Sequence, residues 1–367
     1  MRILLLCWRD TTHPQGGGSE RYLEHVGEYL AAHGHEVIYR TAKHMNGARR
    51  EKRDGIRYSR GGGKFDVYPR ALAALALGRF GKIDAVVDTQ NGIPFFARLA
   101  TNKPVVLLTH HCHKAQWPVA GPFLSRLGWF LESRVAPKIY RNSQYVTVSE
   151  GSAHDLRELG VQNIRIIENG ADPLPQHVPV LEREAGVHLV TLSRLMPQKQ
   201  IEHAMDTVAQ IPGSVLDVIG SGWWEANLRD YAEQHGITDR VRFRGQVTED
   251  YKHALLERAD VHLMPSQMEG WGLAVMEAAQ HGVPTVGYRF GLRDSVKDGE
   301  TGLLVDDVAG LVAATRTLIE DSELRRRLGA NARQFAAGFS WERTGQAWEE
   351  LLTALTAVET AAETTES

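Results

Sequence analysis

The chain has 367 residues, which is long for one hydrophobic core and sufficient for two domains. Hydrophobic residues make up 43% and charged residues 24%, as is ordinary for a globular protein. No run approaches the roughly 18 apolar residues that a membrane span needs. The composition therefore excludes a membrane-spanning protein and favours globular domains.

The charge is distributed unevenly, although the net charge is only −3. Residues 1–170 carry 24 Lys/Arg and 15 Asp/Glu, whereas residues 171–367 carry 18 and 30. This asymmetry indicates two domains with different partners. The basic half could attract an anionic acceptor or an anionic membrane face, and a merely solvated basic surface explains it equally well.

The first residues read as a strand rather than as a targeting segment. The apolar run at 3–7 is too short for a signal peptide and leads directly into polar sequence. The two cysteines, Cys7 and Cys112, cannot form a disulfide framework. Both observations predict a cytoplasmic protein.

Short β-type runs alternate with helical patterns along the whole chain. In the first half, residues 19–32 have apolar side chains at helical spacing and end at Gly34. This alternation predicts βαβ units and mostly parallel sheets. The predicted strands are 3–8, 36–40, 85–88, 105–109, 145–149, 164–167, 189–193, 215–219, 241–243, 261–264, 285–287 and 303–305.

The prolines between residues 171 and 186 interrupt any regular pattern and predict a domain boundary. We therefore expect an α/β protein of two doubly wound domains, 1–172 and 186–338, with a helix at 341–357 returning to the first domain. Residues 358–367 are expected to be disordered. Because such sheets bind ligands beyond the carboxyl ends of their strands, we expect a shared cleft between the domains.

Consecutive glycines, Gly16, Gly17 and Gly18, join the first predicted strand to the first helix. Glycines let backbone N–H groups approach an anion at a helix N-terminus. The loop is not a dinucleotide fingerprint, because Arg21 occupies the third glycine position. A plain βα loop is the alternative interpretation.

The strand at 105–109 runs into His110, His111, Cys112 and His113, where histidines would point into the expected cleft. Hydrogen bonds to a substrate hydroxyl or phosphate are the favoured role. Zinc is the alternative, but adjacent residues seldom close one tetrahedron, and no second Cys/His pair stands at metal spacing.

Apolar and basic residues alternate at helical spacing over residues 123–141. This pattern is typical of a basic amphipathic helix that lies on a membrane surface. A helix packed on the sheet with a basic rim is the alternative.

In the second half, Arg194 and Lys199 follow the strand at 189–193. A planar guanidinium and a mobile ammonium in such a loop can hold a diphosphate. The Gly220-Ser221-Gly222 turn is not a dinucleotide fingerprint, because Glu225 occupies the position of the third glycine.

Two carboxylates flank a predicted helix start in Glu269-Gly270-Trp271-Gly272-Leu273-Ala274-Val275-Met276-Glu277. If Glu269 precedes the first turn and Glu277 lies one turn inside, they stand roughly 10 Å apart along the axis. That span suits the sugar and ribose ends of a nucleotide sugar, with free helix N–H groups between them.

Together these motifs resemble the retaining glycosyltransferases of family 4, which have the GT-B fold. Further matching pieces are Val148-Ser149-Glu150, Ile167-Glu168-Asn169-Gly170, Gly299-Glu300-Thr301-Gly302 and Phe339-Ser340-Trp341. The pieces occur in the family's order over nearly the whole chain. The GT-B fold implies two Rossmann-like domains, with acceptor binding in the first and nucleotide-sugar binding in the second.

The resemblance also implies roles for individual residues. His110, Glu269, Arg194 and Lys199 would be catalytic: Arg194 and Lys199 would hold the donor diphosphate, Glu269 the sugar, and His110 would lie beside it. Glu277 would bind the ribose hydroxyls. The other substrate-binding candidates are Gly16, Gly17, Gly18, His111, His113, Gly270, Trp271, Gly272, Leu273 and Gly220.

The implied reaction is transfer of a hexose-type sugar to a hydroxyl acceptor with retention of configuration, without cofactor or obligatory metal. The donor would be UDP-, GDP- or ADP-linked, and the acceptor a glycan, a small molecule or a lipid-linked, anionic molecule at the inner membrane face. Trp271 replaces a common phenylalanine and Glu168 a common proline. A nucleotide-sugar epimerase and a catalytically silent binding protein are the alternatives.

Overall fold

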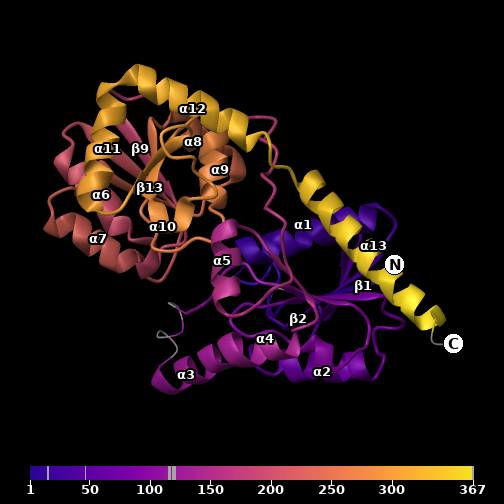
Figure 1. The fold of residues 1–367 in the computed structure, drawn as a ribbon. Coiled ribbons are helices and arrows are strands. Elements are labelled where there is room, and N and C mark those ends of the chain that lie inside the picture. Colours follow the sequence, from indigo (N-terminus) through magenta and orange to yellow (C-terminus); the bar gives the residue numbers. More distant parts are fainter. Residues whose placement is uncertain (15, 46, 115–116, 118–120, 366–367) are drawn as a thin grey trace. The chain divides into compact units, whose positions relative to one another are not determined.

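The computed structural model describes residues 1–14, 16–45, 47–114, 117 and 121–365, which form two compact units. The first comprises Met1–Gly170 and Trp341–Ser367, and the second Ala171–Ser340 (Figure 1). The predicted linker at 171–186 therefore belongs to the second unit. Because the acidic C-terminal helix belongs to the first unit, the charge asymmetry between the units is smaller than between the halves of the sequence.

The first unit is built on one sheet of order β3-β4-β2-β1-β5-β6-β7-β8, in which every pair except β3–β4 is parallel. Its strands are β1 (Arg2–Leu6), β2 (Glu36–Thr41), β3 (Arg50–Arg53), β4 (Ile56–Arg60), β5 (Ala85–Thr89), β6 (Val105–Leu108), β7 (Gln144–Thr147) and β8 (Ile164–Ile166). Its helices are α1 (Gly18–Ala32), α2 (Val67–Ala76), η1 (Ala97–Leu99), α3 (Pro122–Phe130), η3 (Leu131–Val135), α4 (Ala136–Ile139), α5 (Glu150–Glu158) and α13 (Trp341–Thr365).

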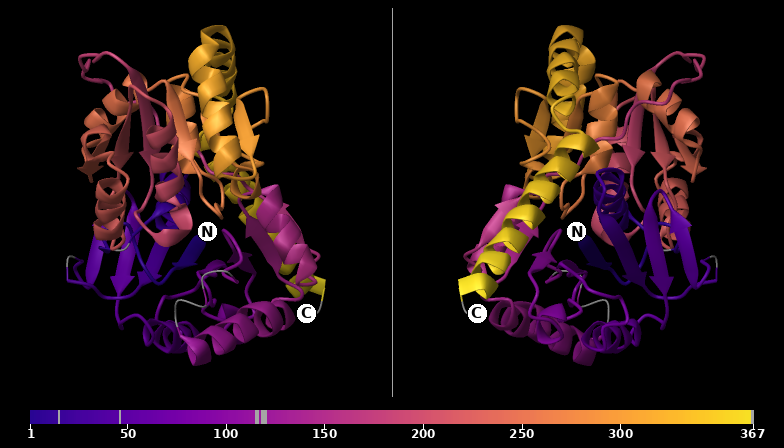
Figure 2. Two further views of the ribbon diagram at one scale, coloured as in Figure 1. Left: turned by 90° about the vertical axis from the view of Figure 1, so that its left-hand side faces the viewer. Right: turned by 90° about the vertical axis from the view of Figure 1, so that its right-hand side faces the viewer.

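Alternation along β1 divides the core of this unit into two layers. Leu4 and Leu6 pack with α2 and α4, whereas Leu5 faces Gly27 of α1. Figure 2 shows helices on both sides of the strands. This layering is typical of a doubly wound sheet.

The sequence analysis missed the hairpin of β3 and β4 because their charged residues do not alternate clearly with apolar ones. The turn carried a signal, however. Asp54 and Gly55 both have positive φ, 50° and 81°. Asp-Gly is favoured in a two-residue hairpin turn for this reason.

The second unit contains one fully parallel sheet of order β11-β10-β9-β12-β13-β14. Its strands are β9 (Val187–Leu192), β10 (Ser214–Ile219), β11 (Val241–Gly245), β12 (Val261–Met264), β13 (Thr285–Tyr288) and β14 (Gly302–Val305). Its helices are η4 (Pro197–Lys199), α6 (Ile201–Gln210), α7 (Glu225–Gln234), η5 (Thr238–Arg240), α8 (Glu249–Arg258), α9 (Leu273–Gln280), α10 (Arg289–Leu292), α11 (Val308–Glu320) and α12 (Ser322–Ala336). The predicted class, two doubly wound α/β domains, is confirmed.

The last helix, α13, returns to the first unit and packs along α1 (Figure 1). Trp348 is fully buried, and its Nε1–H donates to the hydroxyl of Tyr22 at 2.7 Å. That hydroxyl donates to the Ile167 carbonyl at 2.9 Å. The hydrogen bonds thus join α13 and α1 to the chain after β8.

The prediction of disorder over 358–367 is wrong for the described residues, because α13 continues through Thr365. The segment lacks large apolar side chains, but its Ala and Glu residues favour helix. Glu359 also pairs with Lys103 at 3.2 Å.

We expect Trp348→Ala to destabilise the first unit by about 3–5 kcal/mol, because it empties a fully buried site and removes a partner of Tyr22. Urea unfolding monitored by circular dichroism measures this loss. Trp223→Ala is the control, since Trp223 is 63% exposed. Similar losses in the two variants would contradict the anchoring role of Trp348.

Candidate functional site

The carboxyl ends of β9 and β12 place two predicted motifs side by side in the second unit. The two strands are neighbours and parallel, so the loops that follow them leave the same edge of the sheet. The Gln267 N–H donates to the Gln198 carbonyl at 3.0 Å and joins these loops directly. The segment with Lys199 and the segment with Glu269 therefore form one surface.

Lys199 and Glu269 form an ion pair at this edge, between Nζ and Oε1. Their side chains are only 18% and 12% exposed. Gln200, with a φ of +49°, turns the chain out of η4 directly after the lysine. Because the lysine side chain is flexible, the Lys199 ammonium can move from Glu269 to a nearby phosphate oxygen with a small change of its rotamer.

Glu277 lies in α9 and has a partner that the sequence analysis missed. Lys252 of α8 contacts Glu277 Oε1 at 2.6 Å and Glu249 Oε2 at 2.6 Å. Burial lowers the pKa of Lys252, but the two carboxylates outweigh it and raise the pKa overall. The ion pair with Lys252 holds the Glu277 carboxylate in place on α9. In sequence, Glu249 and Lys252 show only the i,i+3 spacing of a surface ion pair.

Gly220 and Gly222 bring the loop after β10 against the loop that carries Arg194. A Cβ on Gly220 would lie 2.0 Å from the Ser193 carbonyl oxygen, and one on Gly222 2.0 Å from that of Leu195. The Leu195 N–H also donates to the Ser221 carbonyl at 3.0 Å. Gly220 therefore helps to position the backbone beside Arg194. The predicted contact between Gly220 and a substrate stays a prediction.

Gly272 precedes α9 with a φ of +89°, in the left-handed region, and α9 begins at Leu273. A Cβ at Gly291 would lie 3.0 Å from the backbone nitrogen of Glu269, so α10 packs closely on the Glu269–Gly270 segment. Trp271 is only 3% exposed, and its ring meets Phe339 at 5.0 Å between centroids. The Trp271 side chain thus packs in the second unit, and its effect on sugar preference stays a prediction.

In the first unit, the glycine loop after β1 contains a buried carboxylate. Glu20 is fully buried, and its Oε2 accepts the N–H of Gly17 at 2.7 Å. Its other oxygen accepts from Arg9 at 3.0 Å. A Cβ on Gly16 would approach the Asp10 carbonyl oxygen to 2.9 Å. Glu20 therefore occupies the Gly17 donor that the sequence assigned to an anion, while Gly18 is the first residue of α1.

The structure distinguishes the three histidines that follow β6. His110 is 6% exposed, its ring meets Tyr22 edge-on, and its Nε2 has no hydrogen-bond partner among the described residues. Burial, together with the nearby His113, lowers the pKa of His110 to about 3, so its imidazole is neutral. This neutral ring can accept or donate a hydrogen bond.

His113 has a structural partner instead. Its backbone N–H donates to Glu132 Oε1 at 2.8 Å, and its Nδ1 lies 3.3 Å from the same oxygen. His111 stacks on His113 with ring centroids 4.4 Å apart. Within the described part of the chain no group of His, Cys, Asp and Glu has the arrangement of a metal site. Which of the three rings meets a sugar stays a prediction.

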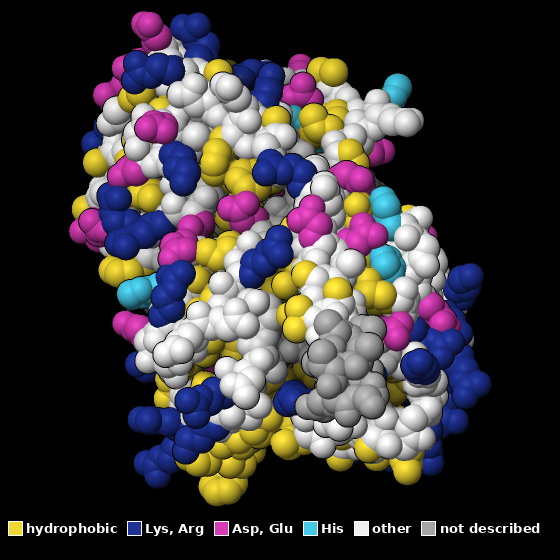
Figure 3. All heavy atoms as spheres, turned by 45° about the vertical axis from the view of Figure 1, so that its right-hand side comes forward, with side chains coloured by type: hydrophobic (Ala, Val, Ile, Leu, Met, Phe, Trp, Pro, Cys, Tyr) yellow, Lys and Arg dark blue, Asp and Glu magenta, His cyan; other side chains and the backbone are white. Residues whose placement is uncertain are grey.

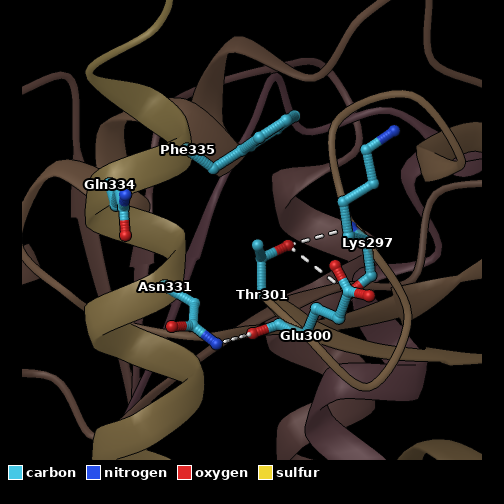
Figure 4. Close-up of a pocket in the computed structure, with 6 residues that line it drawn as sticks. All are labelled: Lys297, Glu300, Thr301, Asn331, Gln334 and Phe335. Carbon is cyan, nitrogen blue, oxygen red and sulfur yellow. Dashed lines mark hydrogen bonds between the residues drawn. The ribbon is translucent and has the colours of Figure 1, made fainter.

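A cavity of about 340 Å³ lies in the second unit between α12 and the loop before β14 (Figure 4). The lining residues are Lys297, Glu300, Thr301, Asn331, Gln334 and Phe335. Thr301 immediately precedes β14, so this cavity is at the amino-terminal edge of the sheet, opposite Lys199 and Glu269. It is therefore separate from the candidate site.

Two family models match the chain, one over each half. "Glycosyltransferase Family 4" matches residues 16–173, and "Glycosyl transferases group 1" matches residues 177–335. Glu20 and His110 lie within the first range, and Lys199, Lys252, Glu269 and Glu277 within the second.

Characterised proteins resemble the chain in sequence and in fold. A GDP-mannose-dependent alpha-(1-6)-phosphatidylinositol monomannoside mannosyltransferase of Mycobacterium tuberculosis is 30% identical over 67% of this chain and 68% of its own length. A glycogen synthase of the same species is 31% identical over 57% of this chain; the chain spans about half the length of that relative, 53%. The structure of sucrose-phosphate synthase from Thermosynechococcus elongatus matches 97% of this chain and 99% of its own, with 24% identity and a TM-score of 0.84. That likeness confirms the predicted fold.

We expect burial of His110 to make folding stability depend on pH. The pKa of His110 is about 3 when folded and about 6.5 when unfolded, so below pH 6.5 only the unfolded chain takes up the proton. Stability contributed by this site therefore falls as the pH decreases from 6.5 towards 3. His110→Gln should reduce the slope of the unfolding free energy by up to about 1.4 kcal/mol per pH unit.

Urea unfolding at pH 7, 6 and 5 measures this slope. His154→Gln is the control, because the His154 side chain is 70% exposed. An unchanged slope in His110→Gln would show that His110 takes up its proton with the same pKa in the folded protein as in the unfolded chain, and would contradict the lowered pKa.

Proposed function

Because the chain belongs to the family 4 glycosyltransferases, we propose that it transfers a sugar from a nucleotide-diphosphate donor to a hydroxyl acceptor. The observation that carries this proposal is the pairing of Lys199 with Glu269 beside the Glu277–Lys252 pair in one unit. Two carboxylates and two lysines at the carboxyl edge of a parallel sheet provide groups for hydroxyls at both ends of a donor and for the phosphates between them.

Each charged group has a distinct task in the proposed reaction. Lys199 and Arg194 bind the diphosphate and stabilise the negative charge that develops on it as the sugar bond breaks. Glu269, once Lys199 turns to the diphosphate, accepts hydrogen bonds from sugar hydroxyls. Glu277 accepts hydrogen bonds from the ribose hydroxyls, and Lys252 holds its carboxylate in position. Charge stabilisation by these side chains needs no metal ion.

We further propose that the acceptor hydroxyl attacks from the face that the diphosphate leaves, so the anomeric configuration is retained. His110 supplies a neutral imidazole with an unfilled Nε2 beside the sugar. It orients a hydroxyl by hydrogen bonding rather than by carrying charge.

Membrane contact through α3 is a second component of the proposal. Phe123 is 75% exposed and Phe130 55%, with Leu124 and Leu127 at 47% and 43%. The exposed cations near them are Arg126, Arg134, Lys138 and Arg141. Figure 3 shows hydrophobic side chains with Lys and Arg beside them along the lower edge, where α2, α3 and α4 lie in Figure 1. Apolar anchors with a basic border suit an anionic lipid surface.

None of the helices, as far as the structure describes them, is long and apolar enough to cross a membrane. Cys7 and Cys112 are buried free thiols, which supports a reducing compartment and therefore the cytoplasm.

We expect Lys199→Met to weaken binding of a nucleoside diphosphate at least tenfold, because a charge-assisted hydrogen bond contributes about 1.5–3 kcal/mol. Binding of the matching nucleoside should stay unchanged. Isothermal titration with UDP, GDP and ADP, in the presence of a chelator, identifies the base and measures both affinities. Equal losses for nucleoside and diphosphate would contradict the proposed role of Lys199.

Phe123→Asp combined with Phe130→Asp should reduce binding to vesicles of anionic phospholipid at least tenfold, because both substitutions place a carboxylate on the lipid-facing surface. Vesicle co-sedimentation measures this effect. Phe290→Asp is the control, since Phe290 is also exposed, at 80%, but lies on α10 in the second unit. Unchanged binding in the double variant would contradict contact through α3.

A further inference from the structure

A buried carboxylate holds the loop after β6, and the proposed reaction does not yet use it. Glu132 lies in η3 and is 1% exposed. Its Oε1 accepts the backbone N–H of His113 at 2.8 Å, and its Oε2 accepts the indole Nε1–H of Trp117 at 2.6 Å. The partners that it has among the described residues are these two. Because burying a carboxylate is costly, its presence here needs a reason.

The backbone of η3 explains how Glu132 reaches this loop. η3 is a single π-helical turn between α3 and α4. Ser133 supports the turn, because its hydroxyl donates to the Trp129 carbonyl at 2.5 Å. Glu132 is buried there, whereas Phe130 at the end of α3 is 55% exposed. Single π-helical turns inside α-helices are rare and often lie at functional sites.

Trp117 provides the second half of the contact. Its N–H donates to the His113 carbonyl at 3.0 Å, so Glu132 binds two residues that are already joined. The indole ring packs on two glycines: a Cβ on Gly92 would lie 3.0 Å from the ring, and one on Gly128 2.3 Å. Gly92 follows β5 and Gly128 lies in α3. The indole therefore connects the loops after two neighbouring strands, β5 and β6, with the helix.

The residues that Glu132 holds lie beside the candidate imidazole. The His113 ring contributes to the lowered pKa of His110, so the two rings are near each other. Nδ1 of His113 lies 3.3 Å from Glu132 Oε1, and His111 stacks on His113. The other end of this histidine segment, residues 110–113, is fixed separately, because the Ser152 hydroxyl donates to the His110 carbonyl at 2.7 Å.

We propose that Glu132 is a positioning residue for sugar transfer: it fixes the His113 end of the histidine segment and so keeps the His110 ring oriented toward the sugar. Ser152 fixes the backbone of His110, and Glu132 fixes the chain that follows it. This inference rests on the proposed function and deepens it, because it adds a buried residue that touches no substrate. The sequence analysis considered only the apolar and basic residues of 123–141.

The test uses the full chain and two variants of this contact. Glu132→Gln keeps the size of the side chain, but its amide NH₂ would face an N–H of His113 or Trp117. Trp117→Phe keeps an aromatic ring between the two glycines and removes the indole N–H. It also keeps the proposal testable if Glu132→Gln does not fold. Glu158→Gln is the matched control, because the Glu158 side chain is a 69% exposed carboxylate on α5 of the same unit.

Nuclear magnetic resonance of ¹⁵N-labelled histidine rings gives the first measurement, with His110→Gln to assign the signal. The titratable groups that face His110 are Tyr22 and His113. Burial and the nearby His113 lower the pKa of His110 to about 3, so its ring should stay neutral from pH 8 to pH 5 in the unsubstituted chain. In Glu132→Gln the loosened segment admits water. The pKa should then rise toward about 6.5, and proton uptake should appear in this range.

The second measurement compares the same His110 signal with nucleotide sugars and with the matching nucleoside diphosphates. The probes are UDP-glucose, GDP-mannose and ADP-glucose, against UDP, GDP and ADP. In the unsubstituted chain the nucleotide sugar that binds should shift the signal more than its diphosphate does, because the ring lies beside the sugar. This sugar-dependent shift should be lost in Glu132→Gln and reduced in Trp117→Phe. Affinity for the nucleoside diphosphate, measured by isothermal titration, should be unchanged in both.

The proposal is overturned if Glu132→Gln keeps both the low pKa of His110 and the sugar-dependent shift. A change in Trp117→Phe alone also overturns it, since the ring packing would then be responsible. A change in Glu132→Gln alone supports it and assigns the positioning to the His113 contact. An equal change in Glu158→Gln, or an equal loss of diphosphate affinity, contradicts a local role.

Failure of the proposed function gives a different result. The unsubstituted chain would then bind none of the three nucleoside diphosphates, whatever the pKa of His110 is in the variants. If the unsubstituted chain binds a nucleoside diphosphate but shows no sugar-dependent shift at His110, the donor assignment stands and the positioning role of Glu132 is overturned.

Discussion

The candidate donor site depends on the parallel pairing of β9 with β12 in the second unit. The two strands are joined in register at Leu189 and Val190, so their carboxyl ends open onto the same edge of the sheet. The hydrogen bond between Gln267 and Gln198 then fixes the two loops to each other. Without this pairing, Lys199 and Glu269, which are 70 residues apart, would have no common surface.

Close backbone contacts stabilise this arrangement from the neighbouring loops. Gly220 and Gly222 let the loop after β10 rest on Ser193 and Leu195, and Gly291 lets α10 rest on Glu269. Any side chain at these positions would push the charged loops outward. These glycines therefore permit close approach of one backbone to another around the site.

Charged side chains in both units take part in ion pairs. Lys199, Lys252, Arg9 and Arg60 each lie beside a carboxylate, as buried or half-buried cations generally do. Arg40 instead donates its side-chain hydrogen bonds to oxygens of Ser59 and Gly61. In the proposed reaction, the ion pairs of the second unit provide carboxylates and cations that a donor can separate.

The sequence by itself determined the alternation of strands and helices, the fold class, and the candidates Arg194, Lys199, Glu269 and Glu277, because hydrophobic periodicity and motif order are local properties. Tertiary structure alone decided which groups meet. Lys252 reaches Glu277 from another helix, Glu20 occupies the Gly17 N–H, and Trp271 packs on Phe339. It also decided that α13 continues to Thr365 and that Arg40 is buried without a close counter-charge. These outcomes depend on burial and on contacts between distant segments, which no local pattern specifies.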